Sequence, residues 1–377
     1  MSDVVVVGGG VVGLSAAYHL VCEGARVTLV DRSDAGQATA AGAGILSGGA
    51  LSRGTDPLHE LAVKAFDYYP ALIARLEADD AGDTGYARCP LMLIASDERD
   101  RREFEAARAA IFARQAATGR PAPEDLREIA PDEARRLFPP LGDVHGALLS
   151  RAAGRVDGRL LARALRRAGE RRGVRIRQGS VARVLVEHGR AAGVAVDREE
   201  LRASSVVIAG GAWSPALTDA LDMPVRVAPQ RGQIIHLRLA GRPTGEWPII
   251  SGFREHYIVA WPGGRIVAGA TRETGSGFEP VLTAGGVREV LSQAMRVAPG
   301  LAPAEVVEMR VGLRPLSADG LPVLGPLPSV EGAYVATGHG PSGLQLGPFS
   351  GKIVGDAVLG RTPDVDLAPF SPARFRV

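Results

Sequence analysis

Cysteine and lysine are scarce in this chain of 377 residues. The two cysteines, Cys22 and Cys89, are too few for a disulfide framework or a cysteine-rich zinc site, and we expect no metal centre. Lysine occurs only at Lys64 and Lys352, so the other 42 of the 44 basic residues are arginines. We interpret this arginine excess mainly as a property of composition.

The chain also lacks a strong excess of charge of one sign and a long apolar run. The 44 basic and 42 acidic residues leave a net charge of +2, so we expect no nucleic-acid partner. No apolar stretch reaches about 18 residues and no signal-peptide pattern precedes residues 4–7, which predicts a cytoplasmic protein without a transmembrane segment. At about 150 residues per domain, the length predicts two or three globular domains.

A dinucleotide-binding pattern occupies the first forty residues. Its parts are, in order, a strand at 4–7, the glycines Gly8, Gly10 and Gly13, a helix at 14–23, a strand at 26–30 and Asp31. The glycines allow a tight turn, close approach of a pyrophosphate and close packing of the helix, whose N-terminus attracts the phosphates. Asp31 can accept hydrogen bonds from ribose hydroxyls and argues against NADP, whereas FAD and NAD both remain open.

Two further glycine-rich segments and a second group of strands follow. Small residues fill positions 38–50, which suits close contact with a large flat group, and a second glycine-rich loop at 337–343 precedes a helix at 344–359. The longer strands of a second sheet are predicted at 225–239, 257–261 and 266–270.

The order of these motifs resembles the D-amino-acid oxidase superfamily over nearly the whole chain, with glycine oxidases and FAD-dependent D-amino-acid oxidases or dehydrogenases as the nearest members. The segments that carry the resemblance are 7–13 with Asp31, 41–46, 154–157, 207–214, 229–233, 312–315, 319–322 and 337–344. It implies an α/β fold in which a Rossmann-type, GR2-like FAD-binding domain (1–86, 147–222 and 316–377) is interleaved with an α+β substrate-binding domain (87–146 and 223–315). The second domain is expected to contain a large mixed or antiparallel sheet.

The resemblance also implies one non-covalently bound FAD. The implied cofactor-binding residues are Gly8, Gly10, Val11, Val12 and Gly13 at the pyrophosphate turn, Asp31 and Arg32 at the ribose, Thr39, Ala43, Gly44 and Ile45 along the pyrophosphate and flavin, Val181 at adenine, Gly210, and the flavin loop Gly338, His339, Gly340, Pro341, Ser342, Gly343, Leu344 and Gln345.

The implied substrate-binding and catalytic residues are Arg314, Tyr257 and His256. Arg314 lies in a G-L-R-P motif whose arginine holds the substrate carboxylate in this superfamily, and Tyr257 fits a tyrosine that hydrogen-bonds the same carboxylate. His256 is a weaker neighbour, and His339 is interpreted as a flavin-loop residue rather than a base. Pro341 stands where some glycine-oxidase-like members have an arginine, so the substrate stays open.

The expected reaction is oxidative deamination of glycine, a D-amino acid or a secondary amino acid. Hydride leaves the α-carbon for flavin N5, the imine hydrolyses to an oxo acid and an amine, and O2, a quinone or an artificial acceptor reoxidises the flavin. The sequence leaves room for a homo-oligomer.

Two alternatives remain at this stage. One is FAD-dependent oxidation of a 2-hydroxy acid, in which His339 or His256 would act as a base. The other is a flavin-dependent tRNA-modification module, supported only by the arginine-rich helix predicted at 157–173; no aromatic residues interleave with its arginines.

Overall fold

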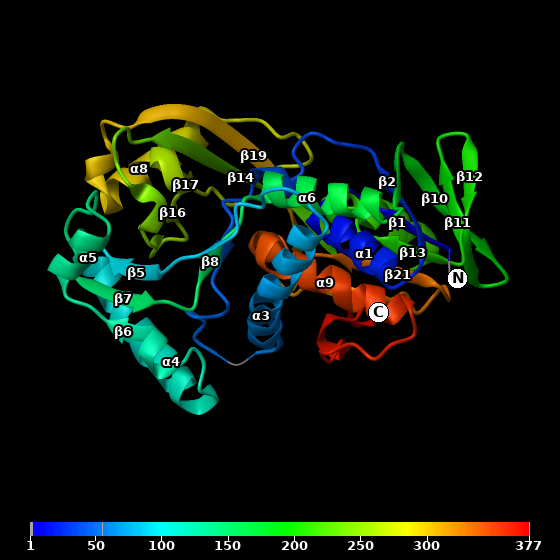
Figure 1. Ribbon diagram of the computed structural model, residues 1–377, viewed down its shortest axis with the longest axis horizontal. Helices are drawn as coiled ribbons and strands as arrows, with labels where there is room; N and C mark the ends of the chain where they lie inside the picture. Colours follow the sequence, from blue (N-terminus) through cyan, green and yellow to red (C-terminus); the bar gives the residue numbers. More distant parts are fainter. Residues whose placement is uncertain (1–2, 55, 377) are drawn as a thin grey trace.

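Two large sheets, each assembled from separated parts of the chain, form the framework of the molecule (Figure 1). The computed structural model describes residues 3–54 and 56–376, so residues 1 and 377, the ends of the expected domain ranges, lie outside it. No helix among the described residues combines the length and the apolar character that crossing a membrane requires.

The N-terminal strand lies inside a six-stranded sheet. The strands follow the order β20 (Val323–Pro326), β21 (Ala333–Thr337), β13 (Ser205–Ile208), β1 (Asp3–Val7), β2 (Arg26–Asp31) and β9 (Arg175–Gln178). All are parallel except β20, which runs antiparallel to β21. Both faces are covered, and this explains why residues 4–7 are uniformly apolar instead of alternating.

Different elements cover the two faces of this sheet. Val4 and Val6 point into a core shared with the helices α1 (Val11–Cys22), α3 (Pro57–Ala78), α6 (Gly158–Arg171) and α9 (Gly343–Val358). Val5 and Val7 point to the opposite side, against a small antiparallel sheet of β10 (Val181–Glu187), β11 (Arg190–Val196) and β12 (Glu199–Arg202). The predicted dinucleotide-binding unit, strand, turn, helix and strand, forms in this half as β1, α1 and β2.

The second framework is a nine-stranded mixed sheet. Its order is β18 (Glu273–Thr274), β14 (Val227–Arg238), β17 (Arg265–Gly269), β16 (Tyr257–Ala260), β15 (Ile249–Gly252), β5 (Leu91–Ala95), β7 (Gly146–Ser150) and β6 (Leu126–Glu128), with β19 (Glu305–Ser317) also paired to β14. Only β15 and β5 run parallel. The strands predicted at 225–239, 257–261 and 266–270 are β14, β16 and β17, and their prediction is confirmed.

The two faces of this sheet have different neighbours. Ile258 and Ala260 belong to a core with α8 (Ala284–Val297) on the outer face. Val259 and Trp261 belong to a core on the inner face, which includes Ala43 from the other half of the molecule and has Tyr257 packed against it. Alternation along β16 therefore turns its odd-numbered side chains toward the FAD-binding half.

Short elements connect the two frameworks. A three-stranded sheet of β3 (Ile45–Leu46), β8 (Gly154–Arg155) and β4 (Ala87–Arg88) lies at the junction, and the buried Arg155 donates hydrogen bonds to the carbonyls of Ala260 at 2.9 Å and Gly245 at 2.8 Å. The other α-helices are α2 (Ala38–Ala41), α4 (Glu98–Thr118), α5 (Pro131–Leu137) and α7 (Pro215–Thr218). We propose the interleaved division into two domains predicted above, with β7 counted in the substrate-binding part because it pairs with β5 and β6.

Candidate functional site

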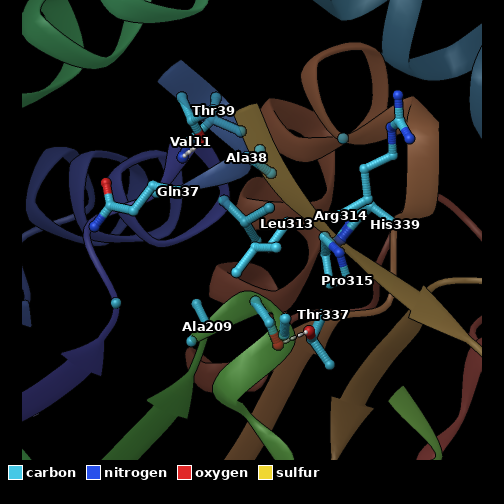
Figure 2. A pocket seen from close by; sticks show the side chains of 18 of the residues that line it. Val11, Gln37, Ala38, Thr39, Ala209, Leu313, Arg314, Pro315, Thr337 and His339 are labelled. Carbon is cyan, nitrogen blue, oxygen red and sulfur yellow. Dashed lines mark hydrogen bonds between the residues drawn. The ribbon is translucent and has the colours of Figure 1, made fainter. Parts of the chain in front are cut away.

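A large cavity lies between the two halves of the molecule. It encloses about 1880 Å³ including its opening to solvent, and its walls come from the turn after β1, the segment 37–45, the inner face of the nine-stranded sheet and the loop before α9. Figure 2 shows Val11 and Thr39 on one side of it and Arg314, Pro315 and His339 on the other. One continuous cavity thus joins the dinucleotide motif to the predicted substrate arginine.

The first end of the cavity is formed by the glycine turn. The Gly9 amide donates to Asp31 Oδ1 at 3.0 Å, which fixes Asp31 at the edge of the turn, and the Val11 amide donates to Thr39 Oγ1 at 3.0 Å. The N-cap residue of α1, Gly10, makes no side-chain hydrogen bond, so the first-turn amides after that of Val11 are available to an anion. A β-carbon at Gly13 would lie only 2.0 Å from the Gly8 carbonyl oxygen. The helix can therefore pack this closely on β1 only because residue 13 is a glycine.

The second end is formed by the loop before α9. This helix also begins without a side-chain cap, and its first residues, Gly343, Leu344 and Gln345, line the cavity. Gln345 Oε1 accepts hydrogen bonds from the Ser47 amide at 2.7 Å and from its hydroxyl at 2.9 Å, which joins α9 to the segment after β3. A second helix N-terminus therefore faces the same cavity.

Arg314 and Tyr257 come together on the inner face of the nine-stranded sheet, and two glycines make room for them. A β-carbon at Gly232 would lie 2.4 Å from the Arg314 guanidinium carbon, and one at Gly269 would lie 2.8 Å from the Tyr257 hydroxyl. Arg314 Nη1 donates to the Thr271 carbonyl at 2.9 Å and to Gln230 Oε1 at 3.4 Å. Its Nε and Nη2 have no backbone or amide partner among the described residues, and a hydrogen bond links the guanidinium to the Tyr257 hydroxyl.

Burial shifts the ionisation of both groups. Burial lowers the pKa of Arg314 from its usual high value, whereas the nearby Tyr257 opposes that shift. Burial raises the pKa of the Tyr257 phenol, and the positive charges of Arg314 and Arg272 oppose that change. At neutral pH the pair therefore consists of a cation and a protonated phenol, and both can donate hydrogen bonds to an anion.

The two candidate histidines occupy different places. His339 lines the cavity, but its Nε2 shares a hydrogen bond of 2.9 Å with Ser350 Oγ, and burial lowers its pKa to about 4. His256 is not brought to the cavity. Its Nδ1 contacts the Arg254 carbonyl oxygen at 2.5 Å and its Nε2 lies 3.3 Å from Glu289 in α8, on the outer side of the sheet. The expectation of a catalytic His256 therefore finds no support, because its ring is directed to Arg254 and Glu289 and not to the cavity.

Most of the expected site residues line the cavity. They are Gly8, Gly10, Val11, Val12, Asp31, Arg32, Thr39, Ala43, Gly44, Ile45, Val181, Gly210, Tyr257, Arg314, His339, Gly340, Pro341, Gly343, Leu344 and Gln345. Those that do not line it are Gly13, Gly338, Ser342 and His256.

Three charged residues of the cavity wall were missed by the sequence analysis: Asp34 near the glycine turn, and Glu255 and Arg272 on the substrate side. Glu255 and Arg272 both line the cavity, and Arg272 Nε lies 3.0 Å from Glu255 Oε2. Glu255 carries no periodic signal, because it lies in the turn before β16 with a φ angle of 63°. Arg272 carries no such signal, because it lies in the connection between β17 and β18.

The residues present fit FAD on three observations. Two uncapped helix N-termini face one cavity, Asp31 lies at the edge of the glycine turn, and small residues line the walls where a long flat group must touch the backbone. Neither cysteine lines the cavity. A dinucleotide site of this kind, placed against an arginine on the sheet of a second half, defines a dinucleotide-dependent oxidoreductase.

Comparison with known proteins identifies the family. The profile of the family described as FAD dependent oxidoreductase (DAO) matches residues 3–357. The chain is 40% identical to the uncharacterized oxidoreductase YurR of Bacillus subtilis and 33% identical to the glycine oxidase of Pseudomonas aeruginosa, over 99% and 98% of both chains, respectively. The crystal structure of iminodiacetate oxidase (IdaA) from Chelativorans sp. BNC1 superimposes with a TM-score of 0.91, at 36% identity and 98% coverage of each chain. The protein belongs to the FAD dependent oxidoreductase family, its cofactor is FAD, and the resemblance to the D-amino-acid oxidase superfamily is confirmed.

Proposed function

We propose that this protein oxidises an amino acid, primary or N-substituted, at the bond between its α-carbon and its nitrogen. The observation that carries the proposal is the meeting of Arg314 and Tyr257 over Gly232 and Gly269 at the cavity wall. Similarity to a glycine oxidase and to an iminodiacetate oxidase supports the same class of substrate.

The protein's part in this reaction is to bind and orient. The edge of the Arg314 guanidinium beside Tyr257 holds the substrate carboxylate in a bidentate manner, and the Tyr257 hydroxyl turns to donate a further hydrogen bond to it. Holding the carboxylate at a fixed place on the sheet sets the direction of the α C–H bond, and such orientation is a large part of the rate enhancement for a bound substrate. Bound FAD supplies the two-electron acceptor for the hydride.

The chemistry of the substrate balances without a protein base. The α C–H bond breaks with its electron pair, the lone pair of the neutral amine forms the C=N bond, and water then adds, so that the C–N bond breaks to give an oxo acid and an amine. O2 or another acceptor takes up the two electrons afterwards.

The properties of the two histidines favour this reaction over oxidation of a 2-hydroxy acid. A hydroxy acid needs a base to take its hydroxyl proton. His256 lies outside the cavity, and His339 is bonded to Ser350 and has a pKa of about 4, which makes it a weak base. Release of ammonia or an amine distinguishes the two reactions.

The arginines of α6 add little to the RNA-binding alternative. Arg171 pairs with Asp80 at 2.9 Å and Arg172 pairs with Asp79 at 2.5 Å, so part of the positive face is neutralised within the molecule. Measuring RNA binding at physiological salt tests that alternative directly.

A substrate panel with Arg314 variants tests the proposal. Glycine, D- and L-amino acids and N-alkyl amino acids are assayed for flavin bleaching without oxygen and then for peroxide in air. We expect Arg314→Ala to lower kcat/KM for the active substrate by about a hundredfold or more, because a buried charged hydrogen-bonded contact is lost. Arg314→Lys should lose less, since it keeps the charge but not the planar fork.

The flavin absorbance of each purified variant is the control, because the FAD content must match that of the wild type. Full activity of Arg314→Ala toward amino acids would overturn the assigned role. Failure of the whole panel to bleach the flavin would overturn the proposed function.

A further inference from the structure

A second guanidinium lines the substrate side of the cavity. Arg272 forms an ion pair with Glu255, in which its Nε lies 3.0 Å from Glu255 Oε2. Glu255 is its one ion-pair partner among the described residues, and the shortest distance of that pair involves Nε and not Nη1 or Nη2. Nη1 and Nη2 are donors through which an arginine can bind a carboxylate with two parallel hydrogen bonds.

The backbone places Arg272 beside Arg314. The residue before it, Thr271, accepts the 2.9 Å hydrogen bond from Arg314 Nη1 through its carbonyl oxygen. Tyr257 pairs with Gly269 across β16 and β17, so Glu255 and Arg272 lie at the open end of the same hairpin, next to Tyr257. The ion pair of Arg272 and Glu255 is thus adjacent to the place proposed for the substrate carboxylate.

The backbone on both sides of Arg272 is firmly held. Thr271 Oγ1 accepts from the Gln233 amide at 3.0 Å and donates to Glu273 Oε1 at 2.7 Å, and Glu273 pairs with Arg231 at 2.6 Å. The position of Arg272 on the cavity wall is therefore fixed by its neighbours, while its own side chain is held by Glu255 alone.

That single contact is easily exchanged. The Glu255 side chain is 67% exposed and the Arg272 side chain is 33% exposed, and an ion pair in such surroundings contributes little stability. A ligand carboxylate that contacts Nη1 and Nη2 forms two charge-assisted hydrogen bonds and can replace the ion pair with Glu255.

We propose that Arg272 binds a second carboxylate of the substrate, with Glu255 as its partner when that carboxylate is absent. The inference rests on the proposed function, because it takes the first carboxylate to be bound by Arg314. The substrate class is an amino acid with two carboxylates, the second carried either on the nitrogen substituent or on the side chain. A monocarboxylic amino acid leaves the ion pair of Arg272 and Glu255 in place and gains no binding energy from Arg272.

Steady-state kinetics with paired substrates test the proposal. Iminodiacetate is compared with N-methylglycine for a carboxylate on the nitrogen substituent, and D-aspartate with D-alanine for one on the side chain. In Arg272→Gln, we expect the ratio of kcat/KM for the dicarboxylate over its monocarboxylate partner to fall roughly ten- to hundredfold in one of the two pairs. Arg272→Lys should retain part of the ratio.

Two further variants sharpen the result. Glu255→Gln removes the competing carboxylate, so we expect KM for the preferred dicarboxylate to fall by roughly threefold or more. Arg102→Gln is the matched control for loss of one positive charge, because Arg102 is exposed on α4 and does not line the cavity. In Arg102→Gln, the ratio of kcat/KM for the dicarboxylate over its monocarboxylate partner should stay at the wild-type value.

A binding measurement that needs no turnover separates this inference from the proposed function. Thiodiacetate, in which sulfur replaces the amine, and (methylthio)acetate are titrated into the holoenzyme by calorimetry. Preference for thiodiacetate that is lost in Arg272→Gln supports the second carboxylate site even if no amine is oxidised. Equal affinity for both ligands excludes the second carboxylate on the nitrogen substituent. Equal losses for the two members of both substrate pairs in Arg272→Gln overturn the inference and leave the proposed function standing.

Discussion

At the scale of single residues, the substrate site depends on two glycines, because their lack of a side chain leaves space for Arg314 and Tyr257. The Arg314 guanidinium occupies the space that a side chain at Gly232 would take, and Tyr257 does the same at Gly269. Neither glycine adopts a left-handed backbone, so their requirement is for space and not for conformational freedom. Gly232 and Gly269 thus shape the substrate site without contacting the substrate.

Substitution of Gly232 by alanine tests this dependence. The added β-carbon would lie 2.4 Å from the Arg314 guanidinium carbon, so the guanidinium must move. We expect KM for the carboxylated substrate to rise by about tenfold or more, since small displacements of a binding group are costly. Steady-state kinetics provide the measurement.

Gly285→Ala is the control for the glycine-to-alanine change itself. A β-carbon at Gly285 in α8 meets no atom within 4 Å, so the variant should keep its kinetics and gain roughly 0.5–1 kcal/mol in free energy of unfolding. If Gly232→Ala binds the substrate as the wild type does, the placement of Arg314 over Gly232 is wrong.

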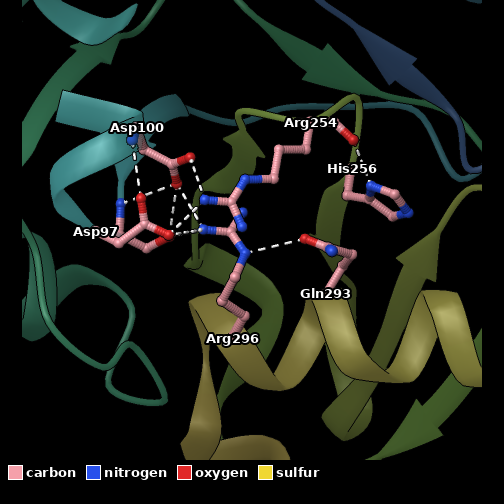
Figure 3. Close-up of polar contacts among 7 residues, drawn as sticks. Asp97, Asp100, Arg254, His256, Gln293 and Arg296 are labelled. Carbon is pink, nitrogen blue, oxygen red and sulfur yellow. Dashed lines mark hydrogen bonds and ion pairs between the residues drawn. The ribbon is translucent and has the colours of Figure 1, made fainter. Parts of the chain in front are cut away.

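At the scale of elements, the turn between β15 and β16 is held in a strained form. Arg254 and Glu255 have φ angles of 67° and 63°, and such angles each cost about 1–3 kcal/mol in a residue other than glycine. Arg254 lies 2.5 Å from Asp97 and 3.2 Å from Asp100, and Arg296 of α8 reaches Asp100 at 2.6 Å (Figure 3). This ionic cluster anchors the turn that places Glu255 at the cavity and precedes Tyr257.

Removing the charge of Asp100 should loosen the turn. Its side chain is 1% exposed and lies between the two guanidinium groups, so Asp100→Asn leaves positive charges partly buried without a full partner. We expect a loss of about 3–5 kcal/mol in free energy of unfolding, measured in denaturant, and a higher KM for the substrate.

Asp132→Asn provides the comparison for a carboxylate at the surface. Asp132 pairs with Arg135 at 2.9 Å, but its side chain is 81% exposed, and the loss should stay within about 1 kcal/mol. Equal losses for Asp100→Asn and Asp132→Asn would show that the cluster does not anchor the turn.

At the scale of the whole molecule, a buried histidine links stability to pH. Burial, together with the positive charge of Arg310, lowers the pKa of His236 in β14 to about 4. The unfolded chain binds the proton near pH 6.5, so the stabilising contribution is complete above that pH and is lost as the pH falls toward 4. We expect the free energy of unfolding to fall by roughly 1–3 kcal/mol over that window because of His236.

The dependence on pH, and not the absolute stability, is the quantity to measure. His236→Gln should flatten the curve of unfolding free energy between pH 6.5 and pH 4. His188→Asn serves as the control, because His188 is exposed in a turn with a φ angle of 52° that asparagine tolerates, and it should keep the wild-type slope. The expectation fails if His236→Gln retains that slope as well.

Sequence patterns predicted the FAD-binding half better than the substrate side. The pattern of strand, glycine turn, helix and Asp31 is local, so it could be read from about thirty neighbouring residues. His256 and Glu255 lie in the turn before β16, where strand alternation does not hold, so no sequence pattern indicated that Glu255 and not His256 lines the cavity.

The fold class and the FAD motif follow from the amino-acid sequence alone, because they depend on local patterns and on the order of motifs along the chain. The prediction that Arg314 binds the substrate carboxylate came from the family resemblance of the G-L-R-P motif. Only the tertiary structure decided that Arg272 stands next to Arg314 and that Asp97, Asp100, Arg254 and Arg296 hold one turn. Apart from the neighbours Asp97 and Asp100, these residues lie 42 to 199 positions apart in the chain. They meet because β14 pairs with both β17 and β19, and because α4 and α8 both pack near the β15–β16 turn. Pairing between distant strands leaves no periodic signal in a single sequence, so the second carboxylate site proposed here could be seen only in three dimensions.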